Sequence, residues 1–142
     1  MVDWKSLEPY PVVHDEKVRW SDTDGNQHVN NVAFSFFYEA GRAMIVLETP
    51  NLLEPDCFFV IITTTIDFLG ELHYPGTIQV ANGIEKIGNS SMQLRQALFQ
   101  NGRCASISYS TIAQVNTKTR SGHPLSASTR AYLESVKIRG TE

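Results

Sequence analysis

Alternating apolar and polar positions predict a series of β-strands in the C-terminal part of the chain. The segment 58–69 is rich in β-branched and aromatic residues, which favour extended structure. The segments 77–88, 90–100 and 103–115 follow it as further predicted strands. Between the last two segments lies an Asn-Gly dipeptide (101–102), the strongest short signal for a hairpin. The pattern therefore predicts antiparallel strands that follow one another along the chain.

The last segment alternates most regularly, and a period of two places successive side chains on opposite faces of a sheet. We expect one face to carry mainly apolar and aromatic side chains and the other to carry serines. The first set is Ala105, Ile107, Tyr109, Thr111, Ala113 and Val115, and the second is Cys104, Ser106, Ser108 and Ser110.

The rest of the chain has a different pattern. Residues 1–10 are expected to form a tail and residues 12–20 a strand. Residues 31–48 have apolar positions around most of a helical circumference, which is typical of a buried helix, and residues 126–137 predict a closing helix. The sequence thus predicts a single α+β domain over 1–142, with an antiparallel sheet around a buried helix.

Composition narrows the class of protein. The chain has 142 residues, of which 42% are hydrophobic and 19% charged, and its net charge of −3 argues against general nucleic-acid binding. We expect no signal peptide and no membrane association, since no apolar run approaches the ~20 residues of a membrane span. Cys57 and Cys104 stand alone, which favours two free, buried thiols in a cytoplasmic protein.

One short string, SDTDGNQHVNN at 21–31, concentrates polar residues in a predicted loop (21–30) directly before the buried helix. The first turn of a helix leaves backbone N–H groups without partners at its positive dipole end. Such donors polarise a carbonyl and stabilise the oxyanion that forms when it is attacked. This chemistry needs a carboxylate nearby as base or nucleophile, and Asp24 is placed to supply it.

This string, the Arg-Trp pair before it and the segment FFYEAGR (36–42) after it resemble the hotdog-fold acyl thioesterases. The nearest matches are the 4-hydroxybenzoyl-CoA thioesterase family and the acyl-acyl-carrier-protein thioesterases, and the similarity continues through IDFLGELHYPGTIQV and EKIGNSSMQL. The resemblance implies a curved antiparallel sheet wrapped around a long central helix. It also implies a cytoplasmic hydrolase of fatty acid metabolism that needs no cofactor. Such enzymes form homodimers or homotetramers with active sites at subunit interfaces, and their substrate is an acyl-CoA or acyl carrier protein.

The resemblance also assigns roles to residues of the string. Asp24 corresponds to the catalytic carboxylate, and the amide that polarises the thioester carbonyl falls at Asn31, with Val32 beside it in the substrate site. In the carrier-protein branch, an aspartate, an asparagine and a histidine at alternate positions act together. These positions are occupied here by Asp24, Asn26 and His28.

Structural roles stay open for several of these residues. Asp22 is expected to cap the loop by accepting nearby backbone N–H groups, and either Asn30 or Asn31 to be the N-cap of the helix. A turn position for Asn26 and an ordering role for His28 are alternatives to their roles in catalysis.

Other acids are weaker candidates. The second acid of the carrier-protein branch falls on Ile62 here, so that component is missing. Glu39 lies on the predicted helix, but eight residues separate it from Asn31, which is about 12 Å at ~1.5 Å per residue. We expect Glu39 to pair with Arg42, with the sheet or with a partner subunit.

Thr64, in an apolar strand, is a candidate for lining the pocket of a partner subunit, and Ser90 and Ser91 for contacts with the thioester or pantetheine. The histidines outside the string have no metal-ligand spacing, so we expect them at the surface and predict no metal. They are His14, His73 and His123.

Three functions of different classes follow from the sequence. The favoured one is a thioesterase that releases free acid and thiol from an acyl-CoA or acyl carrier protein. The others are a non-catalytic module that binds acyl thioesters and a hotdog hydratase or dehydratase, whose different histidine–carboxylate arrangement is not seen here. The sequence leaves open whether Asp24 is a general base or a nucleophile, and which acyl groups fit.

Overall fold

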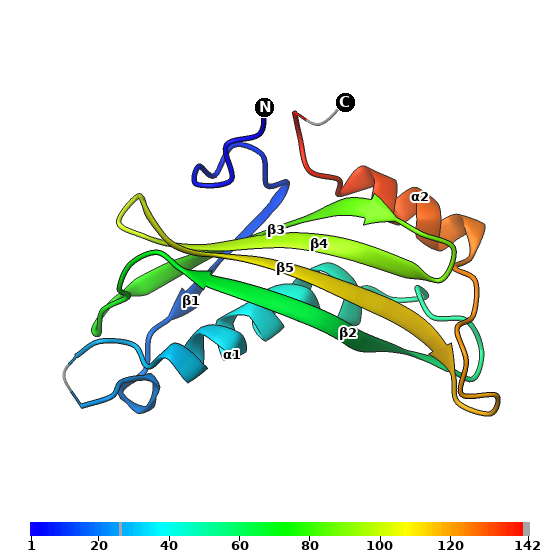
Figure 1. Cartoon of the computed structure of the whole chain (residues 1–142), viewed down its shortest axis with the longest axis horizontal. Helices are drawn as coiled ribbons and strands as arrows, with labels where there is room; N and C mark the ends of the chain where they lie inside the picture. The colour runs from blue at the N-terminus through cyan, green and yellow to red at the C-terminus, as the bar shows by residue number, and fades with distance from the viewer. Residues whose placement is uncertain (26, 141–142) are drawn as a thin grey trace.

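The computed structural model describes residues 1–25 and 27–140 (Figure 1). The order of elements confirms the predicted α+β class. In chain order they are β1 (Val12–Lys17), the 3-10 turn η1 (Trp20–Asp22), α1 (Asn31–Arg42), the π-helical turn η2 (Ala43–Leu47), β2 (Cys57–Phe68), β3 (Thr77–Ile87), β4 (Ser91–Gln100), β5 (Arg103–Asn116) and α2 (Ala127–Ser135).

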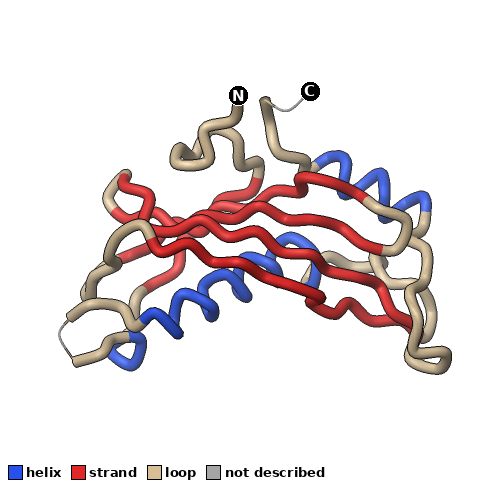
Figure 2. Tube along the Cα trace, viewed as in Figure 1, coloured by secondary structure: helices blue, strands red, loops and turns tan. Residues whose placement is uncertain are grey.

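The strands form a curved antiparallel sheet in the order β1-β3-β4-β5-β2, and α1 lies along one of its faces (Figures 1 and 2). The β4–β5 hairpin turns at Asn101 and Gly102, whose φ angles of 52° and 78° are both positive, as a type I′ turn requires. β1 and β2 are left at the two edges of the sheet. Their positions decide which surfaces remain available to other molecules.

Two predicted elements end earlier than expected. The strand predicted over 12–20 ends at Lys17, because the chain then bends into η1. The helix predicted over 31–48 is α-helical only to Arg42 and continues as the π-helical turn η2. Within the described residues, no helix combines the length and the apolar character needed to cross a membrane.

The predicted face assignment in β5 is wrong at its first residues. A register shift between Leu98 and Phe99 leaves Ala105 without a Cα partner, so that Phe99 faces Cys104 and Leu98 faces Ser106. One extra residue in a strand breaks the alternation, so the side chains before it point to the face opposite to the one that the pattern after it predicts. Ala105 therefore packs in the cluster beneath α1, whereas Cys104 packs on the outer face.

The inner face of the sheet combines apolar packing with buried polar groups. Ala33, Phe34, Phe37 and Tyr38 of α1 belong to the main core cluster, together with residues of β3, β4 and β5. The remaining polar side chains of the β5 serine face lie beneath the helix and are all buried: Ser106, Ser108 and Ser110.

The outer face of the sheet is covered by the N-terminal segment, which the sequence predicted to be a tail. Residues 1–10 contain no regular element of secondary structure, but Tyr10 is only 2% exposed and belongs to a cluster with Phe99 and Ile138. Cys104 packs against this cluster, and burial raises the pKa of its thiol. Cys57 and Cys104 are both free, as predicted, but each is half-buried rather than buried.

Candidate active site

The loop before α1 is held in shape by Asp22, which is 4% exposed. The carboxylate accepts hydrogen bonds from the Arg19 backbone N–H at 2.8 Å and from Arg19 Nη2 at 2.9 Å. The side-chain hydrogen bond, more than the charge of Asp22, raises the pKa of the Arg19 guanidinium. Asp22 thus has the structural role that the sequence predicted.

Asp24 lies in the same loop with an exposed side chain. Its backbone N–H donates to the His28 carbonyl oxygen at 3.1 Å, and Thr23 forms a β-bridge with Val29. The loop therefore folds back on itself and places Asp24 close to the beginning of α1. Asn26, also predicted to be catalytic, lies outside the described residues.

The first turn of α1 settles which asparagine is the N-cap. Asn30 Oδ1 accepts the Val32 backbone N–H at 2.9 Å, and the Asn30 N–H donates to the Asp22 carbonyl oxygen at 2.8 Å. Asn31 is the first helical residue. Its backbone N–H has no acceptor among the described residues, as expected for a first-turn N–H.

A pocket of about 400 Å³ opens where this loop meets α1. The structure thus brings together three predicted site residues: the carboxylate Asp24, the histidine His28 and the helix start at Asn31. Figure 1 shows this loop and the start of α1 at one end of the molecule. The full lining is Asp24, His28, Val29, Asn30, Asn31, Phe34, Gly70 and Glu71.

Beside the pocket lies a cluster that the sequence did not predict, and two of its three residues, His28 and Glu71, line the pocket. His28 and His73 form an antiparallel bridge, and their rings lie 5.0 Å apart at 76°. Glu71 Oε2 lies 3.4 Å from His28 Nε2 and 3.7 Å from His73 Nε2. The available signal was the Glu-x-His spacing at 71–73, since residues two apart in an extended segment point to the same side.

The prediction of a surface position is wrong for His14, whose side chain is only 13% exposed. His14 lies opposite Val80 in the β1–β3 pair, and Val80 belongs to the core cluster under α1. Residues opposite each other in an antiparallel pair share a face, so the His14 side chain points inward. His73 is partly exposed, with 45% of its side chain accessible.

The predicted substrate-binding residues do not all lie near Asp24. Val32 follows Asn31 on α1 and is 66% exposed, and Thr64 of edge strand β2 hydrogen-bonds Ser110 across 2.9 Å. Ser90 and Ser91 lie at the far end of β3, whose 11 residues span roughly 35 Å at ~3.3 Å per residue. They cannot contact a thioester held by Asp24 of the same chain.

Glu39 is exposed on the same outward side of α1 as Asn31 and Ser35. Burial lowers the pKa of the neighbouring Arg42 guanidinium, and the charge of Glu39 opposes this shift. Among the described residues no ion pair joins Glu39 and Arg42, so the predicted pairing of Glu39 stays a prediction. Glu39 is not among the residues that line the pocket at the helix start.

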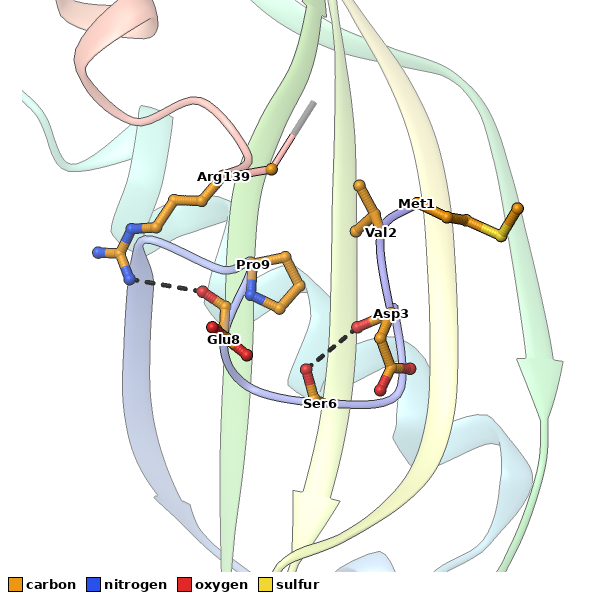
Figure 3. A pocket seen from close by; sticks show the side chains of 8 residues that line it. Met1, Val2, Asp3, Ser6, Glu8, Pro9 and Arg139 are labelled. Carbon is orange, nitrogen blue, oxygen red and sulfur yellow. Dashed lines mark hydrogen bonds between the residues drawn. The ribbon is translucent and has the colours of Figure 1, made fainter. Parts of the chain in front are cut away.

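Another hollow, of about 430 Å³, lies on the outside of the sheet between the N-terminal segment and Arg139 (Figure 3). Arg139 Nη1 donates to the Glu8 carbonyl oxygen at 3.5 Å, and Ser6 Oγ donates to the Asp3 carbonyl oxygen at 3.2 Å. These bonds tie the segment to itself and to the C-terminal part of the chain. The hollow therefore results from the packing of the N-terminal segment.

Comparison with known proteins identifies the family. The thioesterase-like superfamily model matches residues 18–133, and the chain belongs to that superfamily. No curated protein sequence matches the chain significantly.

Solved structures agree with this assignment. A predicted thioesterase from Bacillus stearothermophilus is 29% identical, with a TM-score of 0.81 over 91% of this chain and 98% of that chain. The PA5185 protein from Pseudomonas aeruginosa has a TM-score of 0.85 at 22% identity, covering 96% and 99% of the two chains. A thioesterase from Thermus thermophilus, complexed with coenzyme A and Zn, has a TM-score of 0.78 at 23% identity, covering 92% and 96%.

Family and fold together define the protein as a hotdog-fold thioesterase, a hydrolase of thioester bonds. This confirms the resemblance to acyl thioesterases and the predicted enzyme class. Membership of the 4-hydroxybenzoyl-CoA branch stays a prediction.

Proposed function

We propose that the protein hydrolyses acyl-CoA at the start of α1, with Asp24 as the catalytic carboxylate. The observation that supports this proposal is the shared pocket, which contains both Asp24 and the first residue of α1, Asn31. A thioester carbonyl needs a donor that stabilises its developing negative charge and a base or nucleophile that starts the attack. The pocket has a group for each task.

The donor is the backbone N–H of Asn31. A helix start concentrates positive partial charge on its first N–H groups, and this one has no competing acceptor among the described residues. The carbonyl oxygen of the substrate accepts this N–H, and the interaction strengthens as the oxygen becomes an oxyanion.

Asp24 starts the attack by one of two routes. As a general base it takes a proton from water, which adds to the carbonyl carbon. As a nucleophile it attacks the carbon itself, and the resulting mixed anhydride is then hydrolysed by water. His28 positions the carboxylate or relays a proton, and Asn26 orients the water or the carbonyl. In both routes the thiolate of coenzyme A leaves, takes up a proton and departs as the free thiol.

Coenzyme A is the thiol carrier that we favour over acyl carrier protein. The Thermus thermophilus thioesterase and a Staphylococcus aureus protein with a TM-score of 0.76 were both solved with coenzyme A. We place the reaction in fatty acid metabolism in the cytoplasm.

A second copy of the chain completes the site in this proposal. The outward side of α1 and the edge strand β2 expose large apolar side chains: Val32 (66%), Phe36 (57%), Ile62 (61%) and Phe68 (49%). A long apolar edge strand is a template for pairing with another chain. Pairing here covers the exposed side of α1 next to Asn31 and brings Thr64 toward the partner's pocket, in a homodimer or in a homotetramer built from such dimers.

The test compares free coenzyme A release from short-chain, long-chain and aromatic acyl-CoAs by the wild type and three variants. We expect Asp24→Asn to lower kcat by ~10²–10⁴. Asn31→Pro removes the proposed donor and keeps the helix start, because proline suits the first helical position and the Asn30 ψ of 140° suits a residue before proline. We expect it to lower kcat by ~10²–10³.

The matched control is Asn31→Ala, which keeps the backbone N–H and should stay within a few-fold of the wild type, with helix content checked by circular dichroism. Equal activities of Asn31→Pro and Asn31→Ala would contradict the role of the N–H. Full activity of Asp24→Asn would remove Asp24 from the mechanism. Hydrolysis of acyl-acyl carrier protein but of no acyl-CoA would show that acyl carrier protein, not coenzyme A, is the thiol carrier. Binding of acyl thioesters without any hydrolysis would favour the non-catalytic module.

A further inference from the structure

The side chains of His28, Glu71 and His73 converge beside the pocket. Glu71 Oε2 lies 3.4 Å from His28 Nε2 and 3.7 Å from His73 Nε2, and the candidate ligand atoms all lie within 4.8 Å of one another. Two ligand atoms on one tetrahedral zinc ion, each at ~2.0–2.1 Å, are about 3.3 Å apart. The three side chains therefore need only small adjustments to bind one ion.

We propose that these three side chains bind a divalent transition metal ion, with Zn²⁺ as the best match. Two imidazoles and one carboxylate form a ligand set that zinc uses when three protein ligands leave a fourth position open. Calcium and magnesium prefer ligand sets of oxygen atoms, so they fit less well. His28 and Glu71 also line the pocket that contains Asp24, so the charge of the ion lies beside that pocket.

The backbone holds both histidines in place before any ion arrives. The His73 N–H donates to Gln100 Oε1 at 2.8 Å, and Gln100 Nε2 donates to the His73 carbonyl oxygen at 2.9 Å. The Tyr74 N–H donates to the Gln27 carbonyl oxygen at 2.8 Å, which ties the two segments together. Groups that are fixed in advance lose less conformational entropy on binding, so the cluster is suited to capture an ion.

The ligands are accessible, and the carboxylate is not engaged by a strong cation. The side chains of His28, Glu71 and His73 are 43%, 61% and 45% exposed, so an ion can enter from solvent. Among the described residues, no lysine or arginine forms an ion pair with Glu71. Arg103 is close, but its Nη2 donates to the Glu71 carbonyl oxygen at 3.1 Å.

The test is isothermal titration calorimetry of ZnCl₂ into the full-length chain without a polyhistidine tag. We expect saturable binding of one Zn²⁺ per chain, with affinity at least about tenfold weaker in His73→Gln and in Glu71→Gln. His123→Gln is the matched control, since His123 is not part of the cluster, and it should bind like the wild type. Because the exchanged side chains are partly exposed, the fold should survive, as circular dichroism can verify.

A second readout uses Co²⁺, whose visible absorption becomes more intense in a tetrahedral site. We expect this more intense absorption when Co²⁺ is added to the wild type and to His123→Gln. No saturable Zn²⁺ binding by the wild type would overturn the proposal. So would equal affinities of the wild type, His73→Gln and Glu71→Gln. None of these measurements depends on turnover, so the result stands apart from the outcome for Asp24.

Discussion

At the scale of single residues, Gly41 allows α1 to pack closely against the sheet. Gln96, which is fully buried, donates through Nε2 to the Tyr38 carbonyl oxygen at 2.9 Å and to Asn82 Oδ1 at 2.8 Å. Buried polar groups must keep such partners, because leaving one unpaired costs about 1–3 kcal/mol. These amides therefore cannot move aside easily when the helix above them changes.

We expect Gly41→Ala to lower the free energy of unfolding by up to about 2 kcal/mol. An added Cβ would lie 2.6 Å from Gln96 Nε2 and 2.9 Å from Val80 Cγ1, and closer still to Asn82 Oδ1. Overpacking of this kind costs ~1–3 kcal/mol, and the ~1 kcal/mol by which alanine normally favours a helix over glycine offsets only a part of it.

Urea unfolding measures this difference, with Gly70→Ala as the control. The nearest heavy atom to an added Cβ at Gly70 lies 3.8 Å away, so that variant should stay within about 0.5 kcal/mol of the wild type. Stabilisation by Gly41→Ala would show that the helix can shift away from the sheet.

At the scale of elements, the start of α1 is fixed by its cap to the loop that contains Asp24. Its N-cap Asn30 links the helix to the loop through Val32 and Asp22, and the loop presents Asp24. Much of this site was predictable from the sequence, because a cap, a loop and a helix start are all set within about ten residues. The choice between Asn30 and Asn31 as N-cap was not predictable, since adjacent asparagines have the same capping ability.

We expect Asn30→Ala to lower the free energy of unfolding by ~0.5–2 kcal/mol, because the Val32 N–H loses its side-chain acceptor. Asn30→Ser keeps an oxygen that can cap the helix, and should lie close to the wild type. Thermal unfolding of the two variants measures the difference. Equal stabilities would show that the cap hydrogen bond contributes nothing measurable.

At the scale of the whole molecule, the sheet leaves an exposed edge at β2 and an exposed apolar side on α1. The sequence predicted a buried helix, yet Val32 and Phe36 are 66% and 57% exposed in the single chain. The proposed partner explains why these positions are apolar, since burying them against a second copy removes apolar surface from water.

We expect Phe36→Glu to convert the assembly into monomers and to abolish most of the activity, since a charge at the proposed interface must then be buried. Analytical ultracentrifugation measures the mass, with Val13→Glu at the opposite edge of the sheet as the control that should keep the assembly. A monomeric wild type, or an unchanged mass in Phe36→Glu, would contradict this interface.

The sequence by itself determined the elements whose signals are local. The Asn-Gly turn at 101–102, the helix start at 31 and the polar string around Asp24 each depend on neighbours in the chain, and each lies where the pattern placed it. The α+β class follows from the order of such elements. Turn preferences, caps and side-chain periods act over a few residues, and a single sequence contains all of that information.

Only the tertiary structure decided which distant residues meet. The bulge at Ala105 placed Ala105 and Cys104 on the faces opposite to those predicted. His14 points inward because it pairs with Val80, and His73 lies against His28. Each result depends on the register between strands, and a shift of one residue moves every later side chain to the other face. Register is set by pairing and loop closure across the whole chain, so no local pattern determines it.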